Sequence, residues 1–142
     1  MNANKLTQRS LEAIQGAQSI AVEHDNQQVD QEHLLYALLT QEDSLAASLL
    51  GRMGVDAEAF ARAVEDALGK IPRVTGSGRE ADKIYVTPQL DRALNEAEKQ
   101  AARMKDEYTS VEHLFLGLIE APNDALKKLF RAHKIEQNAF LA

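Results

Sequence analysis

The feature that most constrains the fold of this chain is an internal repeat. When the sequence is shifted by 80 residues, two segments align without a gap, and Glu32–Leu39 falls on Glu112–Ile119. A shift that keeps apolar positions and helix caps together over this length indicates that one structural unit is written twice. The alanines of one helical face keep the same register: Ala13, Ala17 and Ala21 fall on Ala93, Ala97 and Ala101.

Each copy is predicted to form four helices, because apolar residues recur at helical spacing behind residues that cap helices well. Thr7 and Asp30 precede the first two helices of copy one, and Thr87 and Ser110 precede their counterparts. The second helix of each copy is apolar nearly all round, which predicts that it lies at the buried centre. Further helices are predicted over about 44–53, 56–68 and 123–133, and a last one starting near residue 136.

The two copies make up a single domain over residues 1–142. Repeat one covers about 5–68 and repeat two about 85–142, with a linker of about 69–84 that has the composition of a flexible, solvated tether. Repeat two is truncated inside its last helix, so the sequence is expected to be the N-terminal part of a longer protein. The predicted fold is therefore all-α, a pseudo-twofold duplication of a four-helix unit with about eight helices.

Charge and composition exclude several kinds of partner. The net charge is −6, from 16 basic and 22 acidic residues, and neither half is basic, so we expect no nucleic acid and no membrane as partners. The longest unbroken apolar run, Leu34–Leu39, is too short to span a bilayer. The absence of cysteine excludes a disulfide framework and fits a cytoplasmic protein.

No motif for nucleotide binding, nucleophilic hydrolysis or calcium binding is present, so we expect no enzymatic activity, metal or cofactor in this fragment. The one tempting constellation is Glu32-His33, with its copy Glu112-His113. Adjacent residues of a helix point about 100° apart, so such a pair cannot converge on one ion. In the first turn of a helix, Glu complements the helix dipole and His packs over the turn. We interpret both pairs as a requirement of the fold.

With its repeat, two Glu-His-Leu motifs and central linker, the chain resembles the Clp N-terminal domain of Clp/heat-shock AAA+ ATPases. Within that group it is most similar to the ClpB-type disaggregase. The resemblance covers essentially the whole chain. The stretches that carry it are Ala17–Ala21 with His24–Gln27, Ile71–Gly78 leading to Val86–Leu90, and Asp106–Tyr108 through Leu114.

The resemblance implies a substrate-binding module on a hexameric ring that pulls stress-denatured proteins out of aggregates together with the DnaK system. ATP and magnesium would bind in downstream modules that this sequence lacks. The isolated fragment is expected to be a monomer, its parent a cytoplasmic homohexamer, and the ligands unfolded or aggregated polypeptides. The alternative is the adaptor- and substrate-docking N-domain of a ClpA- or ClpC-type unfoldase that feeds a protease.

The resemblance also implies a substrate site with three polar residues, Thr7, Asp106 and Glu112. Leu90, Leu94 and Leu114 are candidates for an apolar groove. Each polar residue also has a structural explanation, since Thr7 is an N-cap worth about 1 kcal/mol and Glu112 complements a helix dipole. Asp106 precedes a turn that aspartate favours. Helical periodicity does not separate groove leucines from core leucines, so both interpretations stay open.

Overall fold

The computed structural model describes residues 3–74 and 85–136, and these form seven α-helices, one short 3-10 helix and two short strands. The all-α fold class is thereby confirmed. Repeat one contains η1 (Ala3–Lys5), α1 (Gln8–Glu23), β1 (Gln28–Val29), α2 (Gln31–Thr40), α3 (Leu45–Arg52) and α4 (Ala57–Gly69). Repeat two contains β2 (Tyr85–Val86), α5 (Pro88–Arg103), α6 (Val111–Glu120) and α7 (Asp124–Ala132).

The helices of the two copies correspond at the offset of 80 residues. Helices α1, α2 and α3 match α5, α6 and α7, whose starts differ from that offset by no more than one residue. The predicted last helix, which would match α4, lies in 137–142 beyond the described residues, and so does the linker over 75–84.

The helix starts follow from capping by polar side chains. The hydroxyl of Thr7 accepts a hydrogen bond from the Ser10 amide at 3.2 Å, and the Thr87 hydroxyl accepts one from the Leu90 amide at 3.0 Å. Thr7 and Thr87 stand 80 positions apart, and each bonds the amide three residues further on, which has no partner within its helix, α1 or α5. In α5 the following proline adds a backbone already set for a helix.

The two strands were not predicted from the sequence. β1 and β2 pair in parallel with Val29 opposite Val86, and a single parallel bridge joins Leu6 to Thr109. These are one contact made twice, since Leu6 and Val86 stand 80 residues apart, as do Val29 and Thr109. Strands of two residues are too short to show alternation, which explains why sequence patterns missed them.

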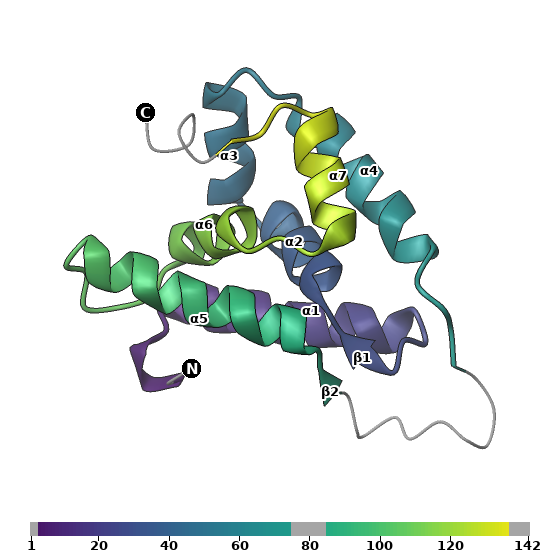
Figure 1. Ribbon diagram of the computed structural model, residues 1–142, viewed down its shortest axis with the longest axis horizontal. Helices are drawn as coiled ribbons and strands as arrows, with labels where there is room; N and C mark the ends of the chain where they lie inside the picture. Colours follow the sequence, from purple (N-terminus) through teal and green to yellow (C-terminus); the bar gives the residue numbers. More distant parts are fainter. Residues whose placement is uncertain (1–2, 75–84, 137–142) are drawn as a thin grey trace.

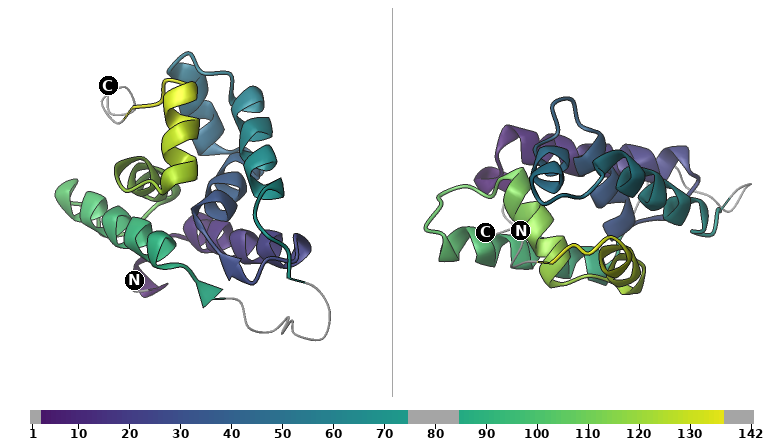
Figure 2. Two further views of the ribbon diagram at one scale, coloured as in Figure 1. Left: turned by 45° about the vertical axis from the view of Figure 1, so that its right-hand side comes forward. Right: turned by 90° about the horizontal axis from the view of Figure 1, so that it is seen from above.

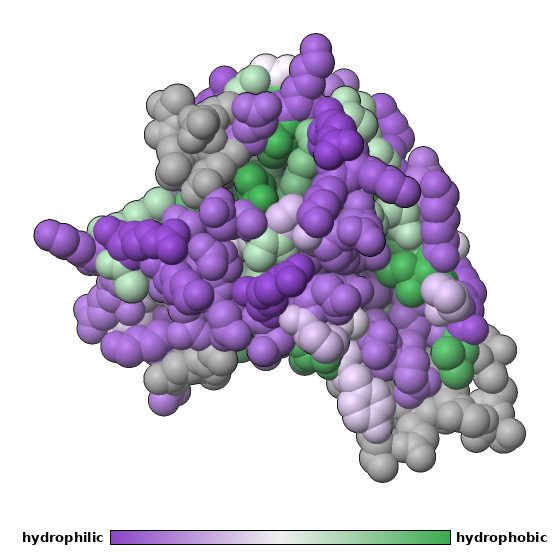
Figure 3. Space-filling view, viewed as in Figure 1, coloured by the Kyte–Doolittle hydropathy of each residue, from purple (hydrophilic) through white to green (hydrophobic). Residues whose placement is uncertain are grey.

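The core forms around α2 and α6, as predicted from their apolar sequences. Both helices are almost entirely buried, with α1 packed on α2 and α5 packed on α6. Helices α3, α4 and α7 gather at one end and the two strands lie at the other (Figures 1 and 2). The face shown in Figure 3 is mostly hydrophilic. Residues of α1 and α5 face a shared space between the two copies, which we call the seam.

Candidate functional site

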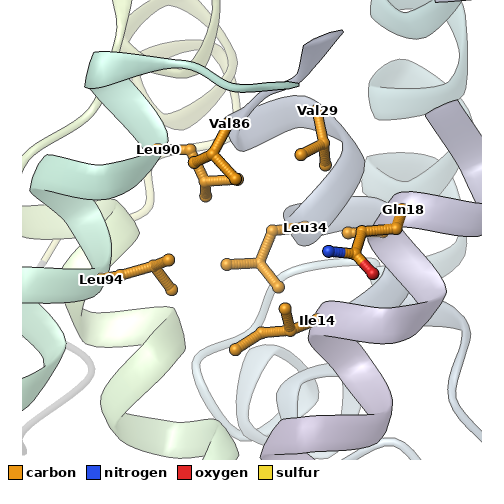
Figure 4. A pocket seen from close by; sticks show the side chains of 8 residues that line it. Ile14, Gln18, Val29, Leu34, Val86, Leu90 and Leu94 are labelled. Carbon is orange, nitrogen blue, oxygen red and sulfur yellow. The ribbon is translucent and has the colours of Figure 1, made fainter. Parts of the chain in front are cut away.

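A small apolar pocket lies at the seam between the two copies. It contains about 260 Å³ not filled by protein atoms, part of it open to solvent. Seven of the eight side chains that line it are apolar, and the amide of Gln18 lies at its edge (Figure 4). The lining residues come from α1, β1, α2, β2 and α5: Ile14, Ala17, Gln18, Val29, Leu34, Val86, Leu90 and Leu94.

The pocket is lined by residues of both copies, but its two sides are not related by the pseudo-twofold symmetry. Ile14 and Leu94 occupy equivalent positions of the two copies and both line it. Leu90, however, corresponds to Ser10, a buried residue whose hydroxyl donates to the Thr109 carbonyl oxygen at 2.9 Å. A hydrogen-bonded polar group thus occupies the position that would mirror the apolar wall. Among the described residues, the lining of this pocket is therefore asymmetric between the two copies.

The structure treats the three candidate leucines differently. Leu90 and Leu94 line the seam pocket. All three leucines are buried in the same core, with exposures of 3%, 9% and 1% for Leu90, Leu94 and Leu114. Leu114 does not line this pocket, whereas its repeat counterpart Leu34 does. Sequence reasoning also missed Ile14, although the repeat carried a usable signal, because Ile14 is the counterpart of the candidate Leu94.

The three candidate polar residues lie on the two segments that the other bridge of the seam joins. The Thr7 amide donates to the Thr109 carbonyl oxygen at 3.1 Å. Asp106 lies three residues before Thr109 and Glu112 three residues after it. None of the three lines the apolar pocket, which lies beside β1 and β2. The two bridges lie near opposite ends of α1, which is about 24 Å long.

Asp106 is held by a buried histidine. Nε2 of His113 contacts Oδ2 of Asp106 at 2.9 Å, while Nδ1 accepts from the Ser110 amide at 2.9 Å. Its ring therefore closes the capping box of α6. The bond to Asp106 also places this carboxylate at the start of the helix.

His33 has the same role in the first copy. Its Nδ1 accepts from the Asp30 amide at 2.9 Å, and its Nε2 contacts Oδ1 of Asn26 at 2.8 Å. Burial, partly offset by the negative charge of Asp30, lowers the pKa of His33 to about 4. Both Glu-His pairs are thus part of helix starts, in agreement with their interpretation as a requirement of the fold.

The two glutamates of these pairs differ in access. Glu32 is 7% exposed and accepts a hydrogen bond from Nδ2 of Asn123 at 2.6 Å, and burial raises the pKa of its carboxyl group. Glu112 is exposed and accepts from the Ser110 hydroxyl at 3.1 Å. Only Glu112 presents a carboxylate to solvent.

Residues 3–74 and 85–136 contain no cluster of three or more His, Cys, Asp or Glu residues suited to a metal ion. None of the helices there has both the length and the apolar character needed to cross a membrane.

The sequence is similar to a known domain family and to known chaperones. Residues 5–133 match the model of the Clp repeat (R) N-terminal domain. The chaperone protein ClpB of Bacillus anthracis is 43% identical over 138 residues, which is 97% of this chain and 16% of that relative. This sequence therefore spans about a sixth of the length of that relative.

Solved structures share the fold. The Hsp104 N-terminal domain from Candida albicans superimposes with a TM-score of 0.82 at 24% identity, over 96% of this chain and 86% of that one. A ClpV N-domain in complex with a VipB peptide gives a TM-score of 0.70 at 22% identity, over 92% and 79%.

Proposed function

Because the chain belongs to the Clp repeat N-terminal domain family, we propose that it is the substrate-binding N-terminal domain of a ClpB-type chaperone. Its ligands are exposed apolar segments of unfolded or aggregated polypeptides. The observation that carries the proposal is the seam pocket, an apolar and partly open hollow at the junction of the two copies. A folded domain with a sealed seam would offer no such place.

The size of the pocket predicts weak binding. Only about 20 Å³ of it is open to the centre of a water-sized sphere, so it takes the end of an aliphatic side chain, and burial of one or two methyl groups contributes about 1–2 kcal/mol. Ordering a flexible polypeptide offsets part of this gain. Contact with the domain is therefore brief and reversible, which suits a module that passes its ligand to a motor.

The three polar candidates contribute unequally in this proposal. The Thr7 hydroxyl caps α1, and the Asp106 carboxylate is bonded to His113. Glu112 is exposed and presents negative charge, so it attracts lysine or arginine side chains near the apolar segment. We assign Glu112 to ligand attraction, and Thr7 and Asp106 to holding the surface around it.

The proposal extends to the longer protein. Downstream AAA+ modules bind ATP and magnesium, assemble into a homohexamer in the cytoplasm and act with the DnaK system, while this domain performs no catalysis. The alternative, a ClpA- or ClpC-type N-domain, is distinguished by the sequence that follows residue 142 in the parent. A long coiled-coil insertion in the first ATPase module supports the disaggregase, and a protease-docking loop in the second supports the alternative.

An NMR titration tests the proposed function. The labelled domain is titrated with a reduced, carboxymethylated protein that stays unfolded, and we expect amide shifts around Leu90, Leu94 and Glu112. Val86→Ser should weaken binding by about threefold to tenfold, because it removes an apolar wall of the pocket.

Val22→Ser is the matched control, since Val22 is an exposed valine of α1 that does not line the seam pocket. We expect it to bind like the unaltered domain. Equal weakening by both substitutions, or a titration without shifts near the seam, would contradict the proposed function.

A further inference from the structure

At the edge of the two-stranded sheet, beside the seam pocket, main-chain groups of Val86 have no partner within residues 3–74 and 85–136. The Tyr85 amide donates to the Gln27 carbonyl oxygen at 3.3 Å, and the Thr87 amide donates to the Val29 carbonyl oxygen at 3.1 Å. In a parallel ladder alternate residues face the partner strand, so the N–H and C=O of Val86 point away from β1. Within the described residues, no hydrogen bond to either group is found.

The same residue forms a wall of the apolar pocket. Val86 is 47% exposed, and its side chain lies with those of Leu90 and Leu94 around the hollow (Figure 4). An open main-chain edge and an apolar hollow thus meet at one residue. A ligand that reaches the pocket past Val86 passes a donor and an acceptor that have no partner within the described residues.

We propose that an unfolded polypeptide binds here as an added β-strand, with its main chain paired to Val86 and the end of one aliphatic side chain in the seam pocket. This inference rests on the proposed function and specifies how the ligand is held. The Val86 N–H donates to a carbonyl oxygen of the ligand, and the Val86 carbonyl oxygen accepts from a ligand amide. Strand addition to an exposed sheet edge is an established mode of peptide recognition.

The open edge favours an extended occupant over a helical one. The main-chain donors and acceptors inside a helix bond to one another, so they cannot pair with Val86. An unfolded chain carries unpaired groups at every residue, and in an extended conformation its side chains alternate between the two faces. One side chain therefore enters the pocket, while its two neighbours face away. Because main-chain pairing does not depend on sequence, this mode suits ligands that share only a single aliphatic residue.

The equivalent position of the other copy does not offer this combination. The bridge from Leu6 to Thr109 is the counterpart of the pair formed by Val86 and Val29. There the Ser10 hydroxyl replaces the side chain of Leu90 and is bonded to the Thr109 carbonyl oxygen. We therefore assign one strand-docking position to each domain.

An N-methyl scan of a peptide tests the proposal. The probe is an acetylated and amidated heptapeptide with one central leucine among serines and threonines, and each analogue carries one N-methyl amide. A strand bound to Val86 donates one amide, to the Val86 carbonyl oxygen, so methylation at that single position should weaken binding about tenfold. Methylation at the other positions should change the dissociation constant by less than about twofold.

Two variants of Val86 test the protein side of the pairing. Val86→Pro removes the outward N–H and keeps the ladder bonds of Tyr85 and Thr87, and proline is tolerated at a sheet edge. Val86→Ala keeps the N–H and removes two methyl groups. We expect Val86→Pro to weaken peptide binding at least about fivefold more than Val86→Ala, with circular dichroism confirming that both variants are folded.

Three outcomes would overturn the proposal. One is a scan in which every methylated peptide binds equally well while replacement of the leucine by serine abolishes binding, because the pocket would then act without main-chain pairing. Another is a Val86→Pro domain that binds like Val86→Ala. The third is a domain that binds the unfolded protein but no heptapeptide, which would leave the proposed function standing and remove strand addition.

Discussion

At the scale of single residues, the two buried histidines show how a duplicated motif can diverge without changing its geometry. His33 and His113 accept from the helix-start amide through Nδ1 and contact a side chain seven residues earlier through Nε2. That earlier side chain is the neutral Asn26 in one copy and the carboxylate Asp106 in the other. Protonation at Nδ1 would remove the acceptor of the capping bond in either copy.

The low pKa of His33 predicts an acid-sensitive fold. Its pKa is lowered to about 4 in the folded chain, against about 6.5 in the unfolded chain. Between these values the unfolded chain binds more protons, so the free energy of unfolding falls as pH drops from about 6.5 to 4. The contribution of His33 is fully present above pH 6.5 and amounts to about 3 kcal/mol.

Urea denaturation at several pH values measures this effect against a His33→Gln variant. Glutamine at this position can still accept the capping bond but does not titrate. Glu32, whose pKa is raised by burial, contributes a slope of opposite sign and is present in both proteins. The unaltered domain should lose more stability on acidification than the variant. Parallel pH profiles for the two proteins would show that protonation of His33 does not contribute to the pH dependence of the free energy of unfolding.

At the scale of helices and strands, local signals made the helices predictable. Thr87 followed by proline fixed the start of α5, and the apolar sequence of α2 indicated its central position. The strands could not be predicted, because β1 and β2 pair Gln28 with Tyr85, residues far apart in the sequence. The pocket was missed in part for the same reason. Leu34 and Leu114 are equivalent in sequence, and only their packing decides which of them lines the pocket.

The close approach of α5 and α6 depends on the absence of a side chain at Gly117. A Cβ atom there would lie 2.4 Å from the Ala93 carbonyl oxygen and 3.0 Å from the Ala97 amide nitrogen. We expect Gly117→Ala to reduce the free energy of unfolding by about 2–3 kcal/mol, because backbone atoms of α5 must move to admit the methyl group.

Gly51→Ala is the matched control within a helix. A Cβ atom at Gly51 would meet no atom within 4 Å, so the substitution should stabilise α3 by up to about 1 kcal/mol. Thermal and urea denaturation of both variants measure the difference. A Gly117→Ala domain as stable as the unaltered one would show that α5 and α6 can separate at little cost.

At the scale of the whole molecule, a buried amide ties the two copies together. Nε2 of Gln31 donates to the carbonyl oxygens of Gln89 and Ala121, both at 2.8 Å. Its Oε1 accepts from the Asn123 amide at 2.8 Å. The repeat counterpart of Gln31 is Val111, so this tie exists once and departs from the duplication. It fixes the starts of α2, α5 and α7 relative to one another, and the seam pocket lies close to the first two.

Loss of this tie should weaken the whole domain. Gln31→Leu keeps a similar volume but leaves two carbonyl oxygens and the Asn123 amide without their buried partner. We expect a loss of about 3 kcal/mol or more in the free energy of unfolding, since each unsatisfied buried group costs about 1–3 kcal/mol. Gln89→Leu is the control, because Gln31 bonds only the main chain of that exposed residue. Urea denaturation should show little change for the control. Equal stability of the two variants would mean that water replaces the Gln31 amide and that apolar packing alone aligns the copies.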